Sequence, residues 1–499
     1  MTNFTFNIHI SKNRRTIVAI DRFEIAGQKI TFLFGESGIG KTIISKAIYG
    51  LLDSDSLDIH INGMTYEQYL GSHFTRKLRQ HGFFVFQEPS THLNPLITLS
   101  GQLKEGSLHR APGEKEILRY LWDTTHDAIF RRILSVYPKP YRPSGGEKQR
   151  ILLAMAFKKI NLLRKSNTVP PEAIFIFDEP SGSLDNHFRN RFLQLLLSDF
   201  QQIPFTALVI THDYSMIGEV HEKYPELRSS IVYRELALET DQLLLRDFAP
   251  RLYLNWLKSA KHTGVQTGGT SEPLLSLQSG YRVFGKTMVI SRQENGGAPC
   301  PLQLHRGEMV YLKAASGIGK TTLAKIMMGL IPCQGLSLRI MEHQINELTS
   351  PGYWKRHIWG KKAGLVFQHA DEALNLNATV REVFGGLPFR HKLNNGSIRT
   401  YLEELFDPPV SEGFLKKKVA YLSGGQKQRL NLLRTLMLDT DILILDEPLN
   451  GLDFESIQKV LGMLQQKQQE GKAILLISHN EDIFDAIIPP SRVYYLKES

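Results

Sequence analysis

The chain of 499 residues contains an internal repeat, in which five short segments recur in the same order in both halves. The glycine-rich segments that contain Lys41 and Lys320 lie 279 residues apart, and the S-G-G segments that begin at Ser144 and Ser423 have the same separation. A V-F-Q segment, an apolar run that ends in D-E and an apolar run that precedes a histidine are also duplicated. A repeat of this length predicts two domains of the same fold in one chain.

The stretch at residues 259–272 separates the two copies. It is rich in glycine and threonine and has no apolar periodicity, which is typical of a flexible linker. We therefore predict a first domain at residues 1–258, a linker at 259–272 and a second domain at 273–499. The first copy has about eleven extra residues after its S-G-G segment, and the basic, proline-containing segment 158–171 is predicted to be this insertion, as a surface loop.

Short apolar runs precede the glycine-rich loop, the D-E pair and the histidine in each half. They occupy residues 30–34, 173–177, 207–210, 309–312, 442–445 and 474–477. Continuous runs of this length suit strands that are buried on both faces of a parallel sheet and alternate with helices. The predicted fold class is α/β, with two domains that each contain a mixed, largely parallel sheet flanked by helices.

Composition narrows the possible partners. The formal charge is +10, but the basic residues are spread along the chain, so we expect a solvated surface that suits polyphosphate ligands and no nucleic-acid partner. The two cysteines, Cys300 and Cys333, have no metal-site spacing and fit a reducing cytosol. No window approaches the roughly 20 apolar residues of a membrane span, so any membrane role is predicted to be peripheral.

Residues 35–42 have the pattern G-x-x-x-x-G-K-T between a predicted strand and a predicted helix, which is the context of a P-loop. In such a loop the backbone N–H groups surround the phosphates, Lys41 reaches the β- and γ-phosphates and the Thr42 hydroxyl binds Mg²⁺. The second copy has the same ending, with alanine at the first glycine position. The predicted phosphate-binding residues are Gly35, Glu36, Ser37, Gly38, Ile39, Gly40, Lys41 and Thr42, and Ala314, Ala315, Ser316, Gly317, Ile318, Gly319, Lys320 and Thr321.

Two buried-strand runs end in paired carboxylates. At the carboxyl end of a strand such a pair points into the ligand crevice. We predict that Asp178 and Asp446 hold Mg²⁺ and that Glu179 and Glu447 act as general bases toward the attacking water.

At its S-G-G segments the chain resembles the ABC ATPases, and the resemblance covers almost the whole sequence. A serine N-cap and exposed glycine amides at a helix N-terminus can bind the γ-phosphate of ATP. The matching motifs are the two P-loops, the Q-loop residues Gln87 and Gln368, the signature residues Ser144, Gly145, Gly146, Ser423, Gly424, Gly425 and Gln426, the D-E pairs, the D-loop residues Leu184, Asp185, Leu452 and Asp453, and the switch histidines His212 and His479.

The resemblance implies two P-loop NTPase domains, each with a helical subdomain, that bind ATP and Mg²⁺ and hydrolyse ATP. In this family two domains face each other, and each ATP lies between the P-loop of one and the signature of the other. Both partners would here come from one chain, in place of an ATPase dimer. Gln87 and Gln368 would join the metal site, His212 and His479 would sense the γ-phosphate, and Tyr281 would stack on adenine, with no counterpart in the first half.

Residues 86–95 read F-Q-E-P-S-T-H-L-N-P, which is similar to a segment of the oligopeptide, dipeptide and nickel importer ATPases, and residues 367–377 keep a fainter form. This similarity implies an energy subunit at the cytoplasmic face of the membrane, bound to two membrane-spanning permease subunits that receive cargo from a solute-binding protein. We expect the segments after Gln87 and Gln368, including Leu93 and Leu374, to contact the permeases. The alternative is a soluble tandem ABC ATPase of translation or repair, although such proteins carry a longer charged linker.

Three positions depart from the family pattern. Ala314 replaces the first P-loop glycine of the second half, and Pro143 and Glu147 replace the leucine and glutamine of the first signature. All three would belong to the ATP site that uses the second P-loop, which we therefore predict to be the weaker of the two.

Overall fold

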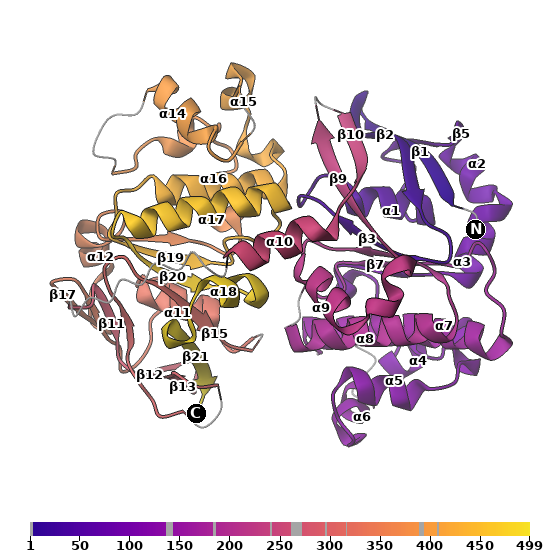
Figure 1. Ribbon diagram of the computed structural model, residues 1–499, viewed down its shortest axis with the longest axis horizontal. Helices are drawn as coiled ribbons and strands as arrows, with labels where there is room; N and C mark the ends of the chain where they lie inside the picture. The colour runs from indigo at the N-terminus through magenta and orange to yellow at the C-terminus, as the bar shows by residue number, and fades with distance from the viewer. Residues whose placement is uncertain are drawn as a thin grey trace. The chain divides into compact units, whose positions relative to one another are not determined.

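The computed structural model describes residues 3–135, 143–182, 186–239, 242–260, 272–294, 297–315, 317–388, 394–406 and 409–499. The chain forms two compact units, residues 1–253 and residues 254–499 (Figure 1). Each unit contains one large sheet, one small antiparallel sheet and flanking helices.

The large sheet of the first unit has a parallel centre. Its strand order is β10 (Gln242–Asp247), β9 (Ile231–Glu239), β3 (Ile30–Phe34), β8 (Thr206–Ile210), β7 (Ile174–Asp178) and β6 (Phe83–Val85). The strands from β9 to β6 run parallel, and β10 is antiparallel to β9. Every residue of β3, β7 and β8 is buried, as their continuous apolar sequences predict.

A small sheet and ten helices accompany this large sheet in the described part of the chain up to residue 260. The small sheet has the order β2 (Arg15–Ile25), β1 (Phe4–Lys12), β4 (Asp58–Ile61) and β5 (Met64–Thr65). The helices are α1 (Lys41–Tyr49), α2 (Tyr66–Gly71), α3 (His73–His81), α4 (Leu99–Gln102), α5 (Glu114–Leu121), α6 (Ala128–Ser135), α7 (Gly145–Ser166), α8 (Asn186–Gln202), α9 (Ser215–Lys223) and α10 (Pro250–Ala260). Helices α4 to α6, which precede α7 in sequence, occupy the place of the predicted helical subdomain.

The second unit repeats this plan. Its large sheet has the order β12 (Gly280–Val283), β13 (Lys286–Ser291), β21 (Val493–Glu498), β15 (Met309–Lys313), β20 (Ala473–Ile477), β19 (Ile442–Asp446) and β18 (Ala363–Val366). The strands from β21 to β18 are parallel, and β12 and β13 join antiparallel. The predicted class, a mixed and largely parallel sheet flanked by helices in each half, is confirmed.

The remaining elements of the second unit are a small sheet and eight described helices. The small sheet has the order β14 (Leu302–Leu304), β11 (Leu275–Leu277), β16 (Ser337–Ile340) and β17 (His343–Asn346). The helices are α11 (Lys320–Met327), α12 (Pro351–His357), α13 (Ala370–Ala373), α14 (Asn395–Leu402), α15 (Glu412–Lys416), α16 (Gly424–Leu436), α17 (Phe454–Gln469) and α18 (Glu481–Ile487).

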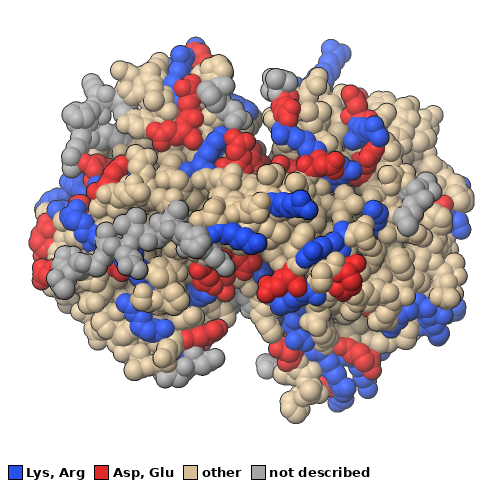
Figure 2. All heavy atoms as spheres, in the orientation of Figure 1, with Lys and Arg blue, Asp and Glu red and all other residues tan. Residues whose placement is uncertain are grey.

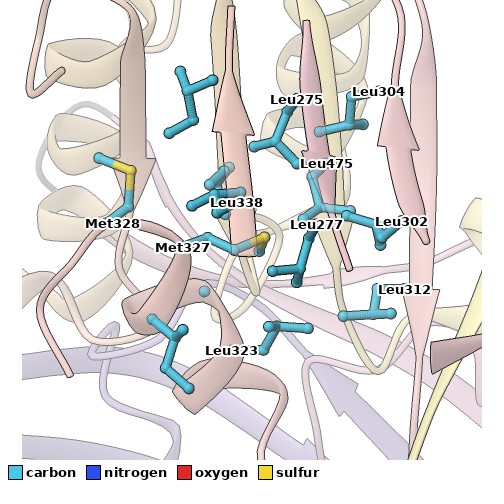
Figure 3. Packing of buried hydrophobic residues seen from close by; sticks show 14 of the residues in the cluster. Leu275, Leu277, Leu302, Leu304, Leu312, Leu323, Met327, Met328, Leu338 and Leu475 are labelled. Carbon is cyan, nitrogen blue, oxygen red and sulfur yellow. The ribbon is translucent and has the colours of Figure 1, made fainter. Parts of the chain in front are cut away.

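The core of the second unit lies where the small sheet, the large sheet and α11 meet (Figure 3). Its side chains are almost fully buried, and they include Leu275, Leu277, Leu302, Leu304, Leu312, Leu323, Met327, Leu338 and Leu475. Burying such side chains stabilises a fold by roughly 1.5–3 kcal/mol each relative to leaving them exposed. This core therefore holds the ends of β15, β19 and β20, where the candidate site residues lie.

The prediction of a surface loop at residues 158–171 is wrong for most of that segment. Helix α7 continues to Ser166 and has 22 residues, whereas α16 has 13. Lys158 is buried, and its ammonium group donates to the Leu103 carbonyl oxygen and to the Glu114 carboxylate. The extra residues therefore continue the helix, and the buried lysine is satisfied by the carbonyl oxygen and the carboxylate instead of facing solvent in a loop.

Most of the predicted linker lies outside the described residues; of residues 259–272, the structure describes Ser259 and Ala260, which end α10, and Glu272. Basic and acidic side chains are mixed on the face of each unit that Figure 2 shows. No helix among the described residues combines the length and the apolar character needed to cross a membrane.

Candidate nucleotide-binding sites

The segments predicted to bind nucleotide follow neighbouring strands in each unit. In the first unit the P-loop follows β3, the D-E pair follows β7 and the histidine follows β8, and the order β3–β8–β7 makes these strands adjacent. In the second unit the same segments follow β15, β19 and β20, which are adjacent as well. Because the carboxyl ends of parallel strands share one edge of a sheet, each unit gathers its segments at one place.

The P-loop of the first unit requires glycine at its first position. Gly35 has a φ of 135°, and a Cβ atom there would lie 2.5 Å from the Leu236 carbonyl oxygen. Lys41 is buried, and its Nζ donates to the carbonyl oxygens of Gly35 at 2.6 Å and Glu36 at 3.0 Å. The ammonium group therefore lies inside the loop, where it can meet a phosphate.

The P-loop of the second unit begins with a different backbone. The φ of Ala314 is not positive, whereas Gly317 and Gly319 have φ values of 79° and 113°, close to those of the corresponding glycines in the first loop. The Nζ of Lys320 still donates to the Ala314 carbonyl oxygen at 2.6 Å. The alanine thus changes the start of the loop without a left-handed residue and without loss of the lysine contact.

The other predicted phosphate-loop residues lie in these two loops or in the first turn of the helix that follows. They are Ser37, Gly38, Ile39, Gly40 and Thr42 in the first unit and Ala315, Ile318 and Thr321 in the second. Ser316, and Leu184 and Asp185 of the first D-loop, lie outside the described residues. In the second D-loop, Asp453 caps α17 by accepting the Ser456 N–H at 2.7 Å.

The P-loop threonines have different partners in the two units. The Thr42 hydroxyl donates to Asp178 Oδ1 at 3.0 Å. The Thr321 hydroxyl donates to Gln368 Oε1 at 3.0 Å. The Q-loop glutamine thus reaches the threonine in the second unit, whereas its counterpart in the first unit is exposed.

Both strand-end aspartates suit a bound cation. Burial raises the pKa of Asp178 and of Asp446 to about 6, and the negative charge of Glu179 adds to the effect at Asp178. Within the described part of the chain, Oδ2 of Asp178 and Oδ1 of Asp446 are buried without a hydrogen-bond partner. An open carboxylate oxygen beside a threonine hydroxyl is a donor set that Mg²⁺ prefers, so these residues fit the predicted metal.

Glu179 pairs with the switch histidine of its own unit. Its φ is 46°, a conformation that is rare outside glycine and is commonly found at functional sites, and its N–H donates to the Ile210 carbonyl oxygen at 2.9 Å. Its Oε2 lies 3.0 Å from His212 Nδ1. Burial of His212 opposes its protonation, but the adjacent Glu179 charge and hydrogen bond outweigh burial and raise the pKa of His212.

Glu447 has the same backbone but a different environment. Its φ is 50°, and its Oε2 accepts the Ser478 hydroxyl at 2.9 Å and the His479 backbone N–H at 3.1 Å, while His479 Nε2 lies 3.6 Å from Oε1. Burial raises the pKa of Glu447 to about 7 against the lowering effect of these hydrogen bonds. The two candidate bases therefore have different partners, a histidine ring for Glu179 and a serine hydroxyl and a backbone N–H for Glu447.

The signature serines cap the long helices of the two units. Ser144 Oγ accepts the Glu147 N–H at 3.2 Å, and the Glu147 carboxylate accepts the Ser144 N–H at 2.7 Å. Ser423 and Gln426 form the same reciprocal pair at 3.1 Å and 3.1 Å. Glu147 and Gln426 therefore differ in charge but not in capping geometry. The glycines predicted to bind phosphate, Gly145, Gly146, Gly424 and Gly425, form the first turns of α7 and α16.

The predicted adenine-stacking role of Tyr281 is wrong. Tyr281 is 4% exposed and packs in the core of the second unit, where burial raises its pKa. The exposed aromatic residue of this hairpin is Phe284, which is 79% exposed and has a φ of 50° in the turn between β12 and β13. The sequence signal that could have identified Phe284 as the exposed residue is the Phe-Gly pair between two alternating apolar segments, which is typical of a turn.

The two leucines predicted to contact membrane partners are also buried. Leu93 is 3% exposed and Leu374 is 5% exposed, so a charge at either position would disturb the core. Leu96, three residues further along the first segment, is 83% exposed. The prediction is wrong for the two leucines because sequence proximity to the Q-loop does not indicate which side chains face solvent.

The duplicated P-loop, the buried aspartate, the adjacent glutamate and the strand-end histidine define a pair of P-loop ATPase domains in one chain. The profile of the family described as "ABC transporter" matches residues 20–181 and 299–450. The chain belongs to this family, and it binds ATP and hydrolyses it to ADP and phosphate.

Proteins with two such domains are similar to nearly the whole chain. The "Glutathione import ATP-binding protein GsiA" of Escherichia coli (strain K12) is 25% identical over 98% of this chain and 84% of its own length. The "Uncharacterized ABC transporter ATP-binding protein YejF" of the same strain is 27% identical over 97% of this chain and 91% of its own length.

A solved structure of an "RNase-L Inhibitor" aligns with a TM-score of 0.62 at 18% identity, over 98% of this chain and 89% of that one. An archaeal ribosome recycling factor in complex with a ribosomal stalk protein aligns with a TM-score of 0.58 at 18% identity, over 95% and 86% of the two chains. At this level of identity the likeness shows the fold alone.

Proposed function

We propose that the chain is the energy subunit of an ABC importer for small peptides or nickel complexes, with peptides favoured. The observation that carries the proposal is the alignment of 98% of the chain with a protein named for glutathione import, since glutathione is a small peptide. The F-Q-E-P-S-T-H-L-N-P segment at residues 86–95 supports the same class of importer.

In the proposed hydrolysis each glutamate after the strand-end aspartate acts as the general base. Glu179 or Glu447 takes a proton from a water molecule while the oxygen of that water forms a bond to the γ-phosphorus of ATP. The bond between the γ-phosphorus and the oxygen that bridges it to the β-phosphate breaks, and ADP leaves. Lys41 and Lys320 bind the phosphate oxygens. His212 lies against Glu179 and can orient the attacking water and the γ-phosphate together.

The proposed metal ligands are the P-loop threonine, the strand-end aspartate and the Q-loop glutamine of each unit. They are Thr42, Asp178 and Gln87 in the first unit and Thr321, Asp446 and Gln368 in the second. Mg²⁺ bound there would neutralise phosphate charge during the reaction.

We further propose that each ATP site is completed by the signature segment of the other half of the chain. The first site would combine the P-loop, Gln87, Asp178, Glu179 and His212 with Ser423 and Gly425, and the second would combine Lys320, Thr321, Gln368, Asp446, Glu447 and His479 with Ser144 and Gly146. Both serines and the glycine amides lie at helix N-termini, which favour bound anions.

The membrane partners would dock beside the Q-loops. The second unit has a pocket of about 540 Å³ that is lined mainly by residues that follow Gln368 in the sequence. The lining residues are Ala373, Asn375, Asn377, Ala378, Glu382, Val383, Gly385, Leu387 and Arg434. In the first unit the exposed Leu96 occupies the matching region. Two permease subunits, which receive cargo from a solute-binding protein, would place the chain at the cytoplasmic face of the membrane.

The catalytic assignment is tested by the double variant Glu179→Gln with Glu447→Gln. Loss of both general bases should lower steady-state ATP turnover by at least about 100-fold while ATP still binds. Turnover within twofold of the parent chain would refute the roles of these glutamates.

The docking assignment is tested by Leu96→Glu, with Leu348→Glu as the matched control. Both leucines are highly exposed, at 83% and 86%, so neither change should unfold the chain. Leu96→Glu should reduce co-purification with the membrane fraction, and the control should not. Equal membrane recovery of both variants would refute docking at Leu96.

The soluble alternative, a tandem ABC ATPase of translation or repair, has the same fold and the same ATP sites. It differs in its partner. Sedimentation of the full chain from its native cells with ribosomes and not with membranes would favour this alternative over the importer.

A further inference from the structure

The two units hold their Q-loops in different ways. Gln368 Oε1 accepts the Thr321 hydroxyl at 3.0 Å, and its side chain is half-buried. Gln87 is exposed, and the matching threonine, Thr42, donates to Asp178. Both glutamines follow the same V-F sequence, so residues outside the motif must cause the difference.

Helix α16 carries three polar side chains on the face that packs against the Q-loop of the second unit. Lys427, Asn431 and Arg434 are spaced i, i+4 and i+7, which places them on one side of the helix. Asn431 is 1% exposed, and its Nδ2 donates to the Phe367 carbonyl oxygen at 3.2 Å. This bond anchors the residue immediately before Gln368.

The other two side chains bind the segment that follows Gln368. Lys427 Nζ lies 2.9 Å from Asp371 Oδ1, and Arg434 Nη1 donates to the Ala373 carbonyl oxygen. The Q-loop is therefore bonded to α16 on both sides of its glutamine. A glutamine fixed on both sides loses little conformational freedom when it binds the threonine.

The P-loop helix α11 holds the same segment from the other direction. Lys325 Nζ lies 2.6 Å from Glu372 Oε2 and 6.0 Å from the centre of the Phe367 ring. The segment is thus bonded to the helix that begins with the P-loop and to the helix that begins with the signature.

Among its described residues the first unit has fewer of these contacts, although Lys46 Nζ lies 5.8 Å from the centre of the Phe86 ring, as Lys325 does near Phe367. At the corresponding positions α7 has Lys148, Leu152 and Met155, and Ser90 takes the place of the aspartate. Lys148 Nζ donates to Ser90 Oγ at 3.0 Å, but leucine and methionine have no N–H or O–H to donate to the Q-loop backbone.

We propose that Lys427, Asn431 and Arg434, here called the α16 stripe, are positioning residues that hold Gln368 on the Thr321 hydroxyl before nucleotide binds. The first unit has leucine and methionine at two of the three matching positions of α7, and its P-loop threonine, Thr42, donates to Asp178. The proposal rests on the proposed function only in taking Gln368 as a metal-site residue, and its primary test uses no nucleotide.

The primary test is hydrogen–deuterium exchange of the nucleotide-free full chain with Asn431→Leu and Arg434→Met, which install the residues of α7. The reporters are the amides of Glu372 and Leu374, which donate to carbonyl oxygens within the segment. Loss of two hydrogen bonds should speed their exchange by about thirtyfold. The matching peptide at residues 85–95 is the internal control and should not change.

Unchanged exchange of the Glu372 and Leu374 amides would overturn the proposal, and so would an equal increase in both peptides, which would show general loosening. If the double variant fails to fold, Arg434→Met alone, compared with Arg434→Lys, gives the same contrast. Lysine keeps a donor, so it should restore most of the protection.

A second readout separates positioning from a merely structural role. In the Glu179→Gln background, Gln368→Ala should raise the Mg²⁺ concentration that gives half-maximal ATPase, and the stripe variant should raise it by a similar factor of about ten. The two changes together should have no greater effect than Gln368→Ala alone. Additive effects would mean that the stripe acts independently of Gln368 and would overturn the proposal.

Discussion

The Glu179→Gln variant should have an ATPase rate that rises steeply with pH, because it leaves Glu447 as its general base. Burial raises the pKa of the Glu447 carboxyl group to about 7. A group with a raised pKa keeps its proton below that pH, and a general base acts only when it is ionised. About 10% of the group is ionised at pH 6 and about 90% at pH 8, so the rate should rise roughly ninefold over this interval.

The matched control is Glu447→Gln, which keeps the first unit's glutamate. ATP, Mg²⁺ and the assay enzymes respond to pH equally in both variants, so the ratio of the two rates isolates the protein's own titration. A further change, Ser478→Ala, removes a 2.9 Å hydrogen bond to the Glu447 carboxylate and should move the profile upward by about one pH unit. A rate of the Glu179→Gln variant that stays constant from pH 6 to pH 8 would refute the argument.

Five further variants test the geometry of the sites. Asp178→Asn should raise the free energy of unfolding of the nucleotide-free chain by about 3 kcal/mol at pH 7.5, measured by urea unfolding, because the pKa of about 6 shows that the ionised Asp178 destabilises the fold. This destabilisation grows between pH 4 and pH 6, so the variant should gain less stability at pH 5. Gly35→Ala should lower the free energy of unfolding by about 3 kcal/mol and abolish ATP binding at the first P-loop, because the new Cβ atom would lie 2.5 Å from a carbonyl oxygen. Ala314→Gly should lower the free energy of unfolding by only about 1 kcal/mol. We propose that the exposed Phe284 stacks on adenine in place of Tyr281, so Phe284→Ala should weaken ATP binding roughly tenfold without changing the melting temperature. Tyr281→Ala should destabilise the fold by about 3–5 kcal/mol, and the reverse pattern would restore Tyr281 as the stacking residue.

The sequence by itself determined the architecture and the positions of the motifs at the strand ends. The repeat predicted two similar halves, and the buried apolar runs predicted the central parallel strands. The P-loop lysines, the D-E pairs and the histidines were placed correctly at one sheet edge because parallel strands bring their carboxyl ends together. These features depend on local patterns and on one general rule of topology.

Only the tertiary structure decided which side chains are buried and which are paired. The basic run at residues 158–171 reads as a loop, but helix α7 extends through most of it, and the buried Lys158 pairs with Glu114. Tyr281 and Phe284 are three residues apart in one hairpin, and only the packing shows that the first is in the core and the second is exposed.

The same reason explains the differences between the two candidate sites. Ala314 and Glu147 break the family pattern in sequence, yet the lysine contact and the helix cap survive in the structure. Conversely, the matching motifs around Gln87 and Gln368 conceal a real difference, because Asn431 acts on the second Q-loop from 63 residues away in the chain. Burial, proton affinity and side-chain pairing depend on neighbours that are distant in sequence, so only the folded chain determines them.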